Sequence, residues 1–211
     1  MASNLVVFDG HNDVLLRLFN KQGNGVEQEF LTGEKNGQVD YPRSLAGGFA
    51  GGFFAIFVPS DEEIAGIEEL MRGEAYDVPL SRPISAVDAL PKALTMASVL
   101  LRIERQSGGR FKVCRTAAEI RACLKANVMA AVMHIEGAEP IDPDFHVLDV
   151  LYEAGLRSVG PVWSRSNQFG HGVPFRFPSS PDTGPGLTDL GKKLIASRLP
   201  TDRDAPNCGC A

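Results

Sequence analysis

Short apolar runs alternate along the chain with longer stretches in which apolar residues recur at helical spacing. An apolar run bounded by polar residues is typical of a strand that is buried on both faces. Five such runs predict strands near residues 5–11, 52–58, 111–114, 129–136 and 158–163. Because strands of this kind are covered on both faces by helices, the pattern predicts a parallel sheet.

The intervening segments carry apolar residues three or four apart, the spacing of amphipathic helices. Thr116 and Glu119 form a capping box at the start of one of them. The pattern predicts helices over residues 14–19, 85–106, 117–125, 142–154 and 189–199. Two stretches are predicted to be loops: the glycine-punctuated region after residue 19, and residues 164–186, a length typical of a lid or a binding loop.

The alternation of strands and helices predicts an α/β fold. A closed eight-stranded barrel of the TIM type typically needs about 250 residues, and this chain has 211. We therefore expect a (β/α)8 TIM-barrel type of fold in which only the first five or so β/α units are present. A doubly wound sheet is the alternative that the same order allows.

Candidate chemistry lies at the end of the first predicted strand. Asp9, His11 and Asp13 are spaced two residues apart, and such residues share one face of an extended backbone. An imidazole and carboxylates that converge on one point would suit a divalent metal ion. The alternative is a capped turn, in which a histidine lies beside an aspartate for local reasons.

A second apolar run, which starts at Met129, ends in the same way. It delivers His134 and Glu136 two residues apart, followed by Gly137. Charged groups at the end of a buried strand are costly unless they are paired or bound to a metal. The two runs together favour a metal site. The alternative is that Glu136 pairs with an arginine while His134 is a hydrogen-bonded core histidine.

Composition limits the classes of function. Hydrophobic residues make up 44% and charged residues 22% of the chain, as in ordinary globular proteins. The net charge of −5 argues against nucleic acid as a partner. Neither a signal peptide nor an apolar stretch long enough to span a bilayer is evident, so the expected location is the cytoplasm. The four cysteines are expected to be free thiols in that compartment.

Several of these motifs together resemble the membrane dipeptidase family, the renal-dipeptidase-like zinc peptidases among the amidohydrolase-type (β/α)8 barrels. The resemblance covers about residues 5–199, and its ordered set is more specific than any single motif. The motifs are FDGHND, HIEGAEP, SVGPVWSRSNQFGHGVPF and GLTDLGKKLI.

The resemblance implies roles for particular residues. His11 and Asp13 match the H-x-D pair that binds the first zinc, and Glu136 matches the catalytic glutamate that bridges two zincs. Asp9 stands where the family often has an acid that orients the histidine. His134 matches no family ligand and is expected to be a barrel-interior residue.

The family mechanism is implied in the same way: a hydroxide shared by two zincs attacks the carbonyl of a dipeptide. Classical members place a substrate-binding histidine after the fifth strand, where this sequence has Trp163-Ser-Arg165. Arg165 and His171 are therefore the candidates for holding a carbonyl or a carboxylate of the substrate. The alternative is that both are surface residues of a loop.

The resemblance stops at Leu199, before the family's later ligands. We expect residues 1–199 to form the N-terminal part of a metallo-dipeptidase barrel and residues 200–211 to be a disordered tail outside the family. Activity of such a truncated barrel is expected to be weak or absent. The competing functions are another binuclear amidohydrolase (a deacetylase or a lactonase), a non-catalytic fragment that oligomerises through open edges, for example as a homodimer, and a metal-free α/β binding domain.

Overall fold

The computed structural model describes residues 6–21, 23–60, 67–180 and 182–197. In chain order the elements are β1 (Val7–Asn12), α1 (Val14–Lys21), α2 (Val26–Thr32), α3 (Tyr41–Ala46), β2 (Phe49–Phe57), α4 (Ile67–Leu70), β3 (Tyr76–Val78), α5 (Ala86–Gln106), β4 (Phe111–Val113), α6 (Ala117–Ala126), β5 (Met129–Glu136), α7 (His146–Ala154), β6 (Leu156–Gly160), β7 (Phe175–Phe177) and α8 (Asp189–Ala196). The predicted tail at 200–211 lies outside the described residues.

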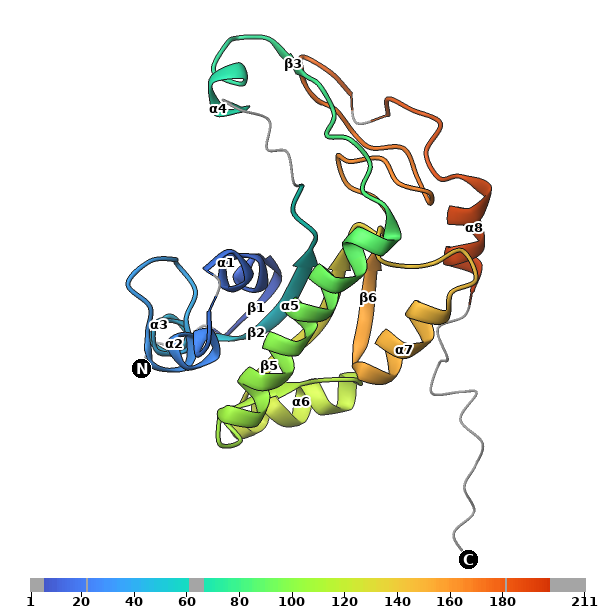
Figure 1. Cartoon of the computed structure of the whole chain (residues 1–211). Coiled ribbons are helices and arrows are strands. Elements are labelled where there is room, and N and C mark those ends of the chain that lie inside the picture. Colours follow the sequence, from blue (N-terminus) through green and yellow to red (C-terminus); the bar gives the residue numbers. More distant parts are fainter. Residues whose placement is uncertain (1–5, 22, 61–66, 181, 198–211) are drawn as a thin grey trace, which may run out of the picture.

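A five-stranded parallel sheet organises the chain (Figure 1). β5 is its centre: β2 pairs along one edge, while β4 and β6 share the other edge, β4 at the start of β5 and β6 at its end. β1 pairs with β2 on the outside. The predicted α/β fold with a parallel sheet is therefore confirmed, and its five strands are the five apolar runs of the sequence, with ends shifted by a few residues.

The expected burial of the first strand is wrong. Val7 and Phe8 in β1 are 39% and 36% exposed, although the apolar run predicted a strand covered on both faces. An apolar run shows that a strand is suited to burial. Whether the strand is buried depends on whether another segment of the chain covers it. β5 does fit the expectation, because nearly all of its residues are buried.

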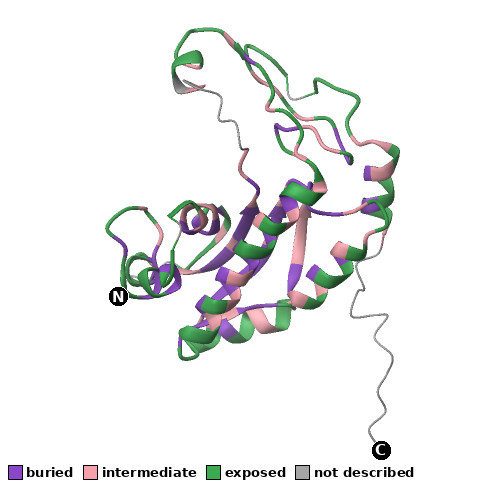
Figure 2. Cartoon of the chain, in the orientation of Figure 1, coloured by how far each residue is buried: buried purple, intermediate pink, exposed green. Residues whose placement is uncertain are grey.

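The main core lies between the sheet and the helices that cover it (Figure 2). At its centre three fully buried rings, Phe30, Phe54 and Phe111, meet edge to face, with centroids 5.4–6.4 Å apart. Aromatic pairs in this geometry add stability beyond the area that they bury. The rings come from α2, β2 and β4, so this cluster joins a helix to two strands of the sheet.

Two glycines allow β2 to approach its neighbours closely. A Cβ atom on Gly51 would collide with the carbonyl group of Ala130 in β5, and one on Gly52 would lie 2.7 Å from the Cβ atom of Asp9 in β1. The small-residue stretch before the second strand therefore has a packing function, as is usual for glycine within a strand.

Three local predictions are wrong. The glycine-punctuated region after residue 19 contains α2 and α3, so it is not a continuous loop. The predicted loop 164–186 contains β7, which pairs antiparallel with β3 in a lobe beyond the carboxyl ends of the main strands (Figure 1). The helix expected from residue 142 starts at His146. The Asp142 carboxylate accepts hydrogen bonds from the backbone N–H groups of Asp144, His146 and Val147, so Asp142 itself lies before the helix.

The other predicted helices are present. The capping box at Thr116 and Glu119 opens α6, and Thr188 caps α8 through the N–H group of Gly191. Among the described residues, no helix combines the length and apolar character needed to cross a membrane.

Asp40 is the polar anchor of the region between β1 and β2. Its side chain is 2% exposed and accepts hydrogen bonds from the backbone N–H groups of Glu34 and Arg43 and from the Arg43 guanidinium. Burial alone would favour the neutral acid, but the hydrogen bonds from Arg43 and Glu34 prevail and lower the pKa of Asp40 from 3.8 to about 2.

Asp40→Asn is expected to lower the free energy of unfolding by about 1–3 kcal/mol at neutral pH, because it removes charge-assisted hydrogen bonds. Since the folded-state pKa is depressed, this contribution is complete above the ordinary pKa of 3.8 and disappears as the pH falls towards 2. Urea unfolding at several pH values checks it, with the exposed Asp149→Asn as control. A difference between wild type and Asp40→Asn that did not change with pH would contradict the assignment.

Candidate metal centre

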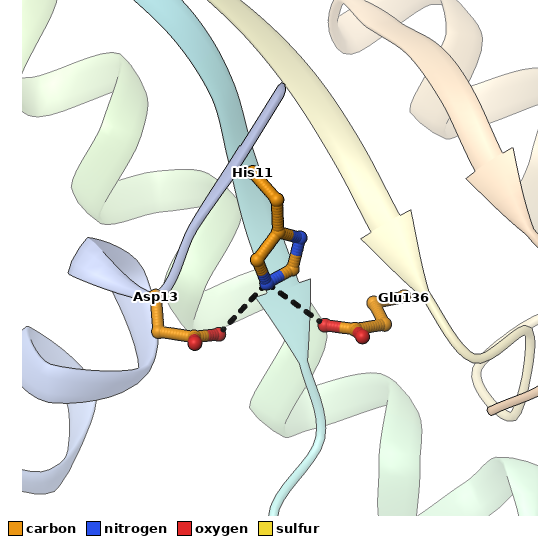
Figure 3. A group of neighbouring side chains, drawn as sticks. All are labelled: His11, Asp13 and Glu136. Atoms are coloured by element: carbon orange, nitrogen blue, oxygen red, sulfur yellow. Dashed lines mark ion pairs between the residues drawn. The ribbon is translucent and has the colours of Figure 1, made fainter. Parts of the chain in front are cut away.

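Three side chains converge at the carboxyl ends of β1 and β5 (Figure 3). The Nε2 atom of His11 lies 3.5 Å from Asp13 Oδ1 and 3.3 Å from Glu136 Oε2. One ligand atom from each residue can be chosen so that all three lie within 4.8 Å of one another. The sequence predicted this convergence, and the structure brings these three residues together.

The sheet and the first helix position these groups. His11 lies within β1, and Asp13 occupies the single position between β1 and α1. Glu136 is the last residue of β5, and β2 lies between the two strands. Because the strands are parallel, their carboxyl ends meet at one edge of the sheet, so residues far apart in sequence face one another.

The site is partly open to solvent. The side chains of His11 and Asp13 are 41% and 57% exposed, and that of Glu136 is 21% exposed. Burial raises the pKa of Glu136, the negative charges of Asp13 and Glu139 raise it further, and His11 opposes the rise. A cation bound among these groups would oppose the rise, because a nearby positive charge favours the ionised carboxylate.

The donor set suits a divalent metal ion. Imidazole nitrogen and carboxylate oxygen are ligands of zinc, and such atoms within a few ångströms of one another can be drawn onto a single ion. In the part of the chain that the structure describes, this is the one group of three or more histidine, cysteine, aspartate or glutamate side chains close enough to hold an ion.

The Asp9 carboxylate forms its hydrogen bond with Asn12 and not with the expected His11. Its carboxylate accepts a hydrogen bond of 3.0 Å from the side-chain amide of Asn12, which also donates to the carbonyl of Phe53. Asp9 thus orients the Asn12 amide that links the end of β1 to β2. Its proposed action on His11 stays a prediction.

His134 lies among the sheet residues that face the metal centre. Its Nδ1 atom is 2.9 Å from Ser158 Oγ in β6, and its ring meets those of His11 and Phe53 edge on, each with centroids 6.2 Å apart. Burial lowers the pKa of His134, and the nearby His11 lowers it further. This placement agrees with the expectation that His134 is an interior residue of the barrel.

Arg165 is buried rather than presented on a loop surface. It is 4% exposed and pairs with Glu139, 3.0 Å away; it also donates to the carbonyl of Val58 and the hydroxyl of Ser60. The geometry favours a structural role for Arg165, and substrate binding by it stays a prediction. The sequence reasoning missed Glu139, whose only signal is an acidic residue in an otherwise apolar and proline-bounded turn.

His171 is exposed and lies apart from the three converging residues. Its backbone N–H donates to the carbonyl of Gly186, which joins the segment before β7 to the segment after it. Gly137, just after Glu136, has a φ of +91°, and a Cβ atom there would collide with the Glu139 carboxylate. The turn after β5 therefore needs glycine at position 137.

These features define a class of protein: a parallel α/β sheet of the barrel type, with a metal-binding constellation at the carboxyl ends of its strands. The chain belongs to the membrane dipeptidase family (peptidase family M19), whose sequence model matches residues 1–198. The expected family membership is confirmed.

Solved structures and a sequence relative support this assignment. A metallopeptidase from Rhodobacter sphaeroides, liganded with a phosphinate mimic of the dipeptide L-Ala-D-Ala, is 52% identical with a TM-score of 0.88, covering 92% of this chain and 56% of that one. The dipeptidase AC of family M19 is also 52% identical, with a TM-score of 0.87 and coverages of 92% and 55%. An uncharacterized protein of Acinetobacter calcoaceticus from the PQQ-III 3′ region is 36% identical over 193 residues, covering 90% of this chain and 58% of the relative. The chain thus spans between half and three fifths of the length of these relatives.

The first prediction for this site concerns metal content. We expect about one zinc ion per purified chain by elemental analysis, and its loss in His11→Ala and Glu136→Gln, because each change would remove one of the three candidate ligands. His146→Ala, an exposed histidine on α7, is the matched control and should keep the ion. Zinc binding that is indifferent to both ligand changes would refute this assignment.

The second prediction concerns Arg165. Arg165→Met should lower the free energy of unfolding by about 3–5 kcal/mol, because it leaves the buried Glu139 carboxylate without its charge partner. The double change with Glu139→Leu should recover part of the loss. Arg72→Met, which breaks an exposed ion pair with Glu69, should cost at most about 1 kcal/mol. Unchanged stability in Arg165→Met would return this residue to the candidates for substrate binding.

Proposed function

We propose that this chain carries the first-metal half of a zinc-dependent dipeptidase site and that the reaction served by such a site is the hydrolysis of dipeptides. The observation that carries the proposal is the convergence of His11, Asp13 and Glu136 in a member of the membrane dipeptidase family. The Rhodobacter sphaeroides relative, whose structure holds a dipeptide mimic, indicates the class of substrate.

Each of the three residues has a separate role in this proposal. His11 offers Nε2 as a neutral nitrogen ligand, and Asp13 offers a carboxylate oxygen from the solvent side, next to the start of α1. Glu136 projects from the end of β5, so that one of its oxygens faces His11, and the other would be the atom to contact a second ion. A bound divalent ion would polarise the peptide carbonyl and lower the pKa of water.

The protonation state of Glu136 matters for this arrangement. A carboxylate must be ionised to serve as a ligand, and partial burial together with the charges of Asp13 and Glu139 raises the pKa of Glu136, while His11 opposes this rise. The cation and Glu136 therefore stabilise each other: the ion holds the carboxylate ionised, and the carboxylate holds the ion between the strand ends.

The test is hydrolysis of unblocked dipeptides such as L-Ala-D-Ala by the zinc-supplemented chain. Glu136→Gln is expected to lower kcat/KM by roughly 100-fold or more, since even the loss of a residue behind a metal ligand costs about 10- to 100-fold. His146→Ala should retain the wild-type rate.

Parallel assays with N-acetyl amino acids and with lactones distinguish the alternatives. Preference for either of these over dipeptides would replace the proposal with a deacetylase or a lactonase, which would use the same ligands. A chain that binds zinc through His11 and Glu136 but hydrolyses none of the three substrate classes would be a metal-binding, non-catalytic unit.

A further inference from the structure

A cavity of about 380 Å³ is lined by residues other than the three candidate metal ligands. It lies at the carboxyl end of β2, between α1 and the segments that follow β2 and β6. Its walls include Phe57, Trp163 and Phe175, with Leu16 and Leu80 among the apolar residues around them. A volume of this size falls within the range of small-molecule pockets, roughly 300–1,000 Å³.

Three aromatic rings form one wall of this cavity. Trp163 meets Phe57 and Phe175 edge on, with centroids 5.4 Å apart in both pairs and interplanar angles of 87° and 77°. Trp163 is nonetheless 44% exposed. A large ring that is fixed by two neighbours yet open to solvent is typical of a binding surface rather than of a core.

The register of the sheet places this wall next to the metal ligands. Phe57 in β2 is the direct partner of Glu136 in β5, and partners in neighbouring strands present their side chains on the same face, roughly 5 Å apart. Successive Cα atoms of a peptide are about 3.8 Å apart. A dipeptide whose peptide bond lies at His11 and Glu136 can therefore reach the cavity with one of its side chains.

Arg165 fixes the wall without offering a free charge to the cavity. Its guanidinium lies over the ring of Phe57, 5.5 Å from the centroid, while its N–H groups donate to Glu139, to the carbonyl of Val58 and to Ser60. The positive charge is thus neutralised within the protein. What remains for a ligand at this wall is aromatic and aliphatic surface.

From these observations we propose that the cavity receives a large apolar side chain of the dipeptide substrate and that Trp163 determines this preference. This inference rests on the proposed dipeptidase function and specifies its substrate class: dipeptides with a leucine-sized or phenylalanine-sized side chain are preferred over those of glycine or of charged residues. One missing methylene in an apolar pocket is worth roughly 10-fold or more in kcat/KM.

The chain carries its own reporter for this pocket, because Trp163 is its single tryptophan. Titration of the EDTA-treated chain, in which turnover is stopped, with L-Leu-L-Ala should give a saturable change in tryptophan emission. Gly-L-Ala and L-Lys-L-Ala should need at least about 10-fold higher concentrations for the same change.

Phe57→Ala removes the ring that joins Trp163 to the sheet, and it should weaken the response to L-Leu-L-Ala about 10-fold. The matched control is Phe177→Ala, a 55% exposed phenylalanine that lies outside the cavity lining and should leave the response unchanged. Thermal unfolding of both variants verifies that they fold.

Trp163→Phe should keep the kinetic preference for leucine over glycine in the zinc-loaded chain, whereas Trp163→Ala should lose it.

The outcomes separate this inference from the proposed function. A selective emission change without hydrolysis would retain the pocket and overturn the dipeptidase activity. Hydrolysis at equal rates for L-Leu-L-Ala and Gly-L-Ala, or an emission change that is the same for both, would overturn the pocket and leave the activity standing. No emission change with any dipeptide up to its solubility would also overturn it.

Discussion

The pairing of β2 with β5 is the constraint on which the rest of the structure depends. Seven successive residue pairs run in register from Gly51 and Ala130 to Phe57 and Glu136, and this register requires the absence of a side chain at Gly51. It places Glu136, a candidate metal ligand, beside Phe57, and it carries β1 on the far side of β2. A shift of one residue would turn Glu136 away from the face on which the site lies.

Around this frame, the protein separates charge from apolar surface over a short distance. The imidazole and carboxylates of the metal centre stay accessible at the strand ends, while the charge of Arg165 is neutralised by Glu139 below the surface. Burying such a pair adds little net stability. Its effect is to hold three segments together, because Arg165 joins the turn after β5, the end of β2 and the loop that carries Trp163.

The sequence predicted the parts of this structure that depend on local chemistry. The bounds of β5 and the convergence of His11, Asp13 and Glu136 at the strand ends followed from apolar runs and from residues two apart. Contacts between distant segments could not be predicted in this way. The exposure of β1, the pairing of β3 with β7 and the burial of Arg165 against Glu139 all depend on which segments meet in three dimensions, and no single stretch of sequence contains that information.

The distribution of the ligands has a consequence for folding. His11 lies in β1, the outermost and partly exposed strand, and Asp13 follows directly after it. Glu136 ends the buried central strand, and within the described sheet β1 pairs with β2 alone. An ion held by all three would act as a cross-link that passes over β2 and fastens the edge of the sheet to its centre. A ligand that binds only the native state at 100 times its Kd stabilises that state by about 2.7 kcal/mol. The stability of this edge strand would thus depend on the concentration of free metal in its surroundings.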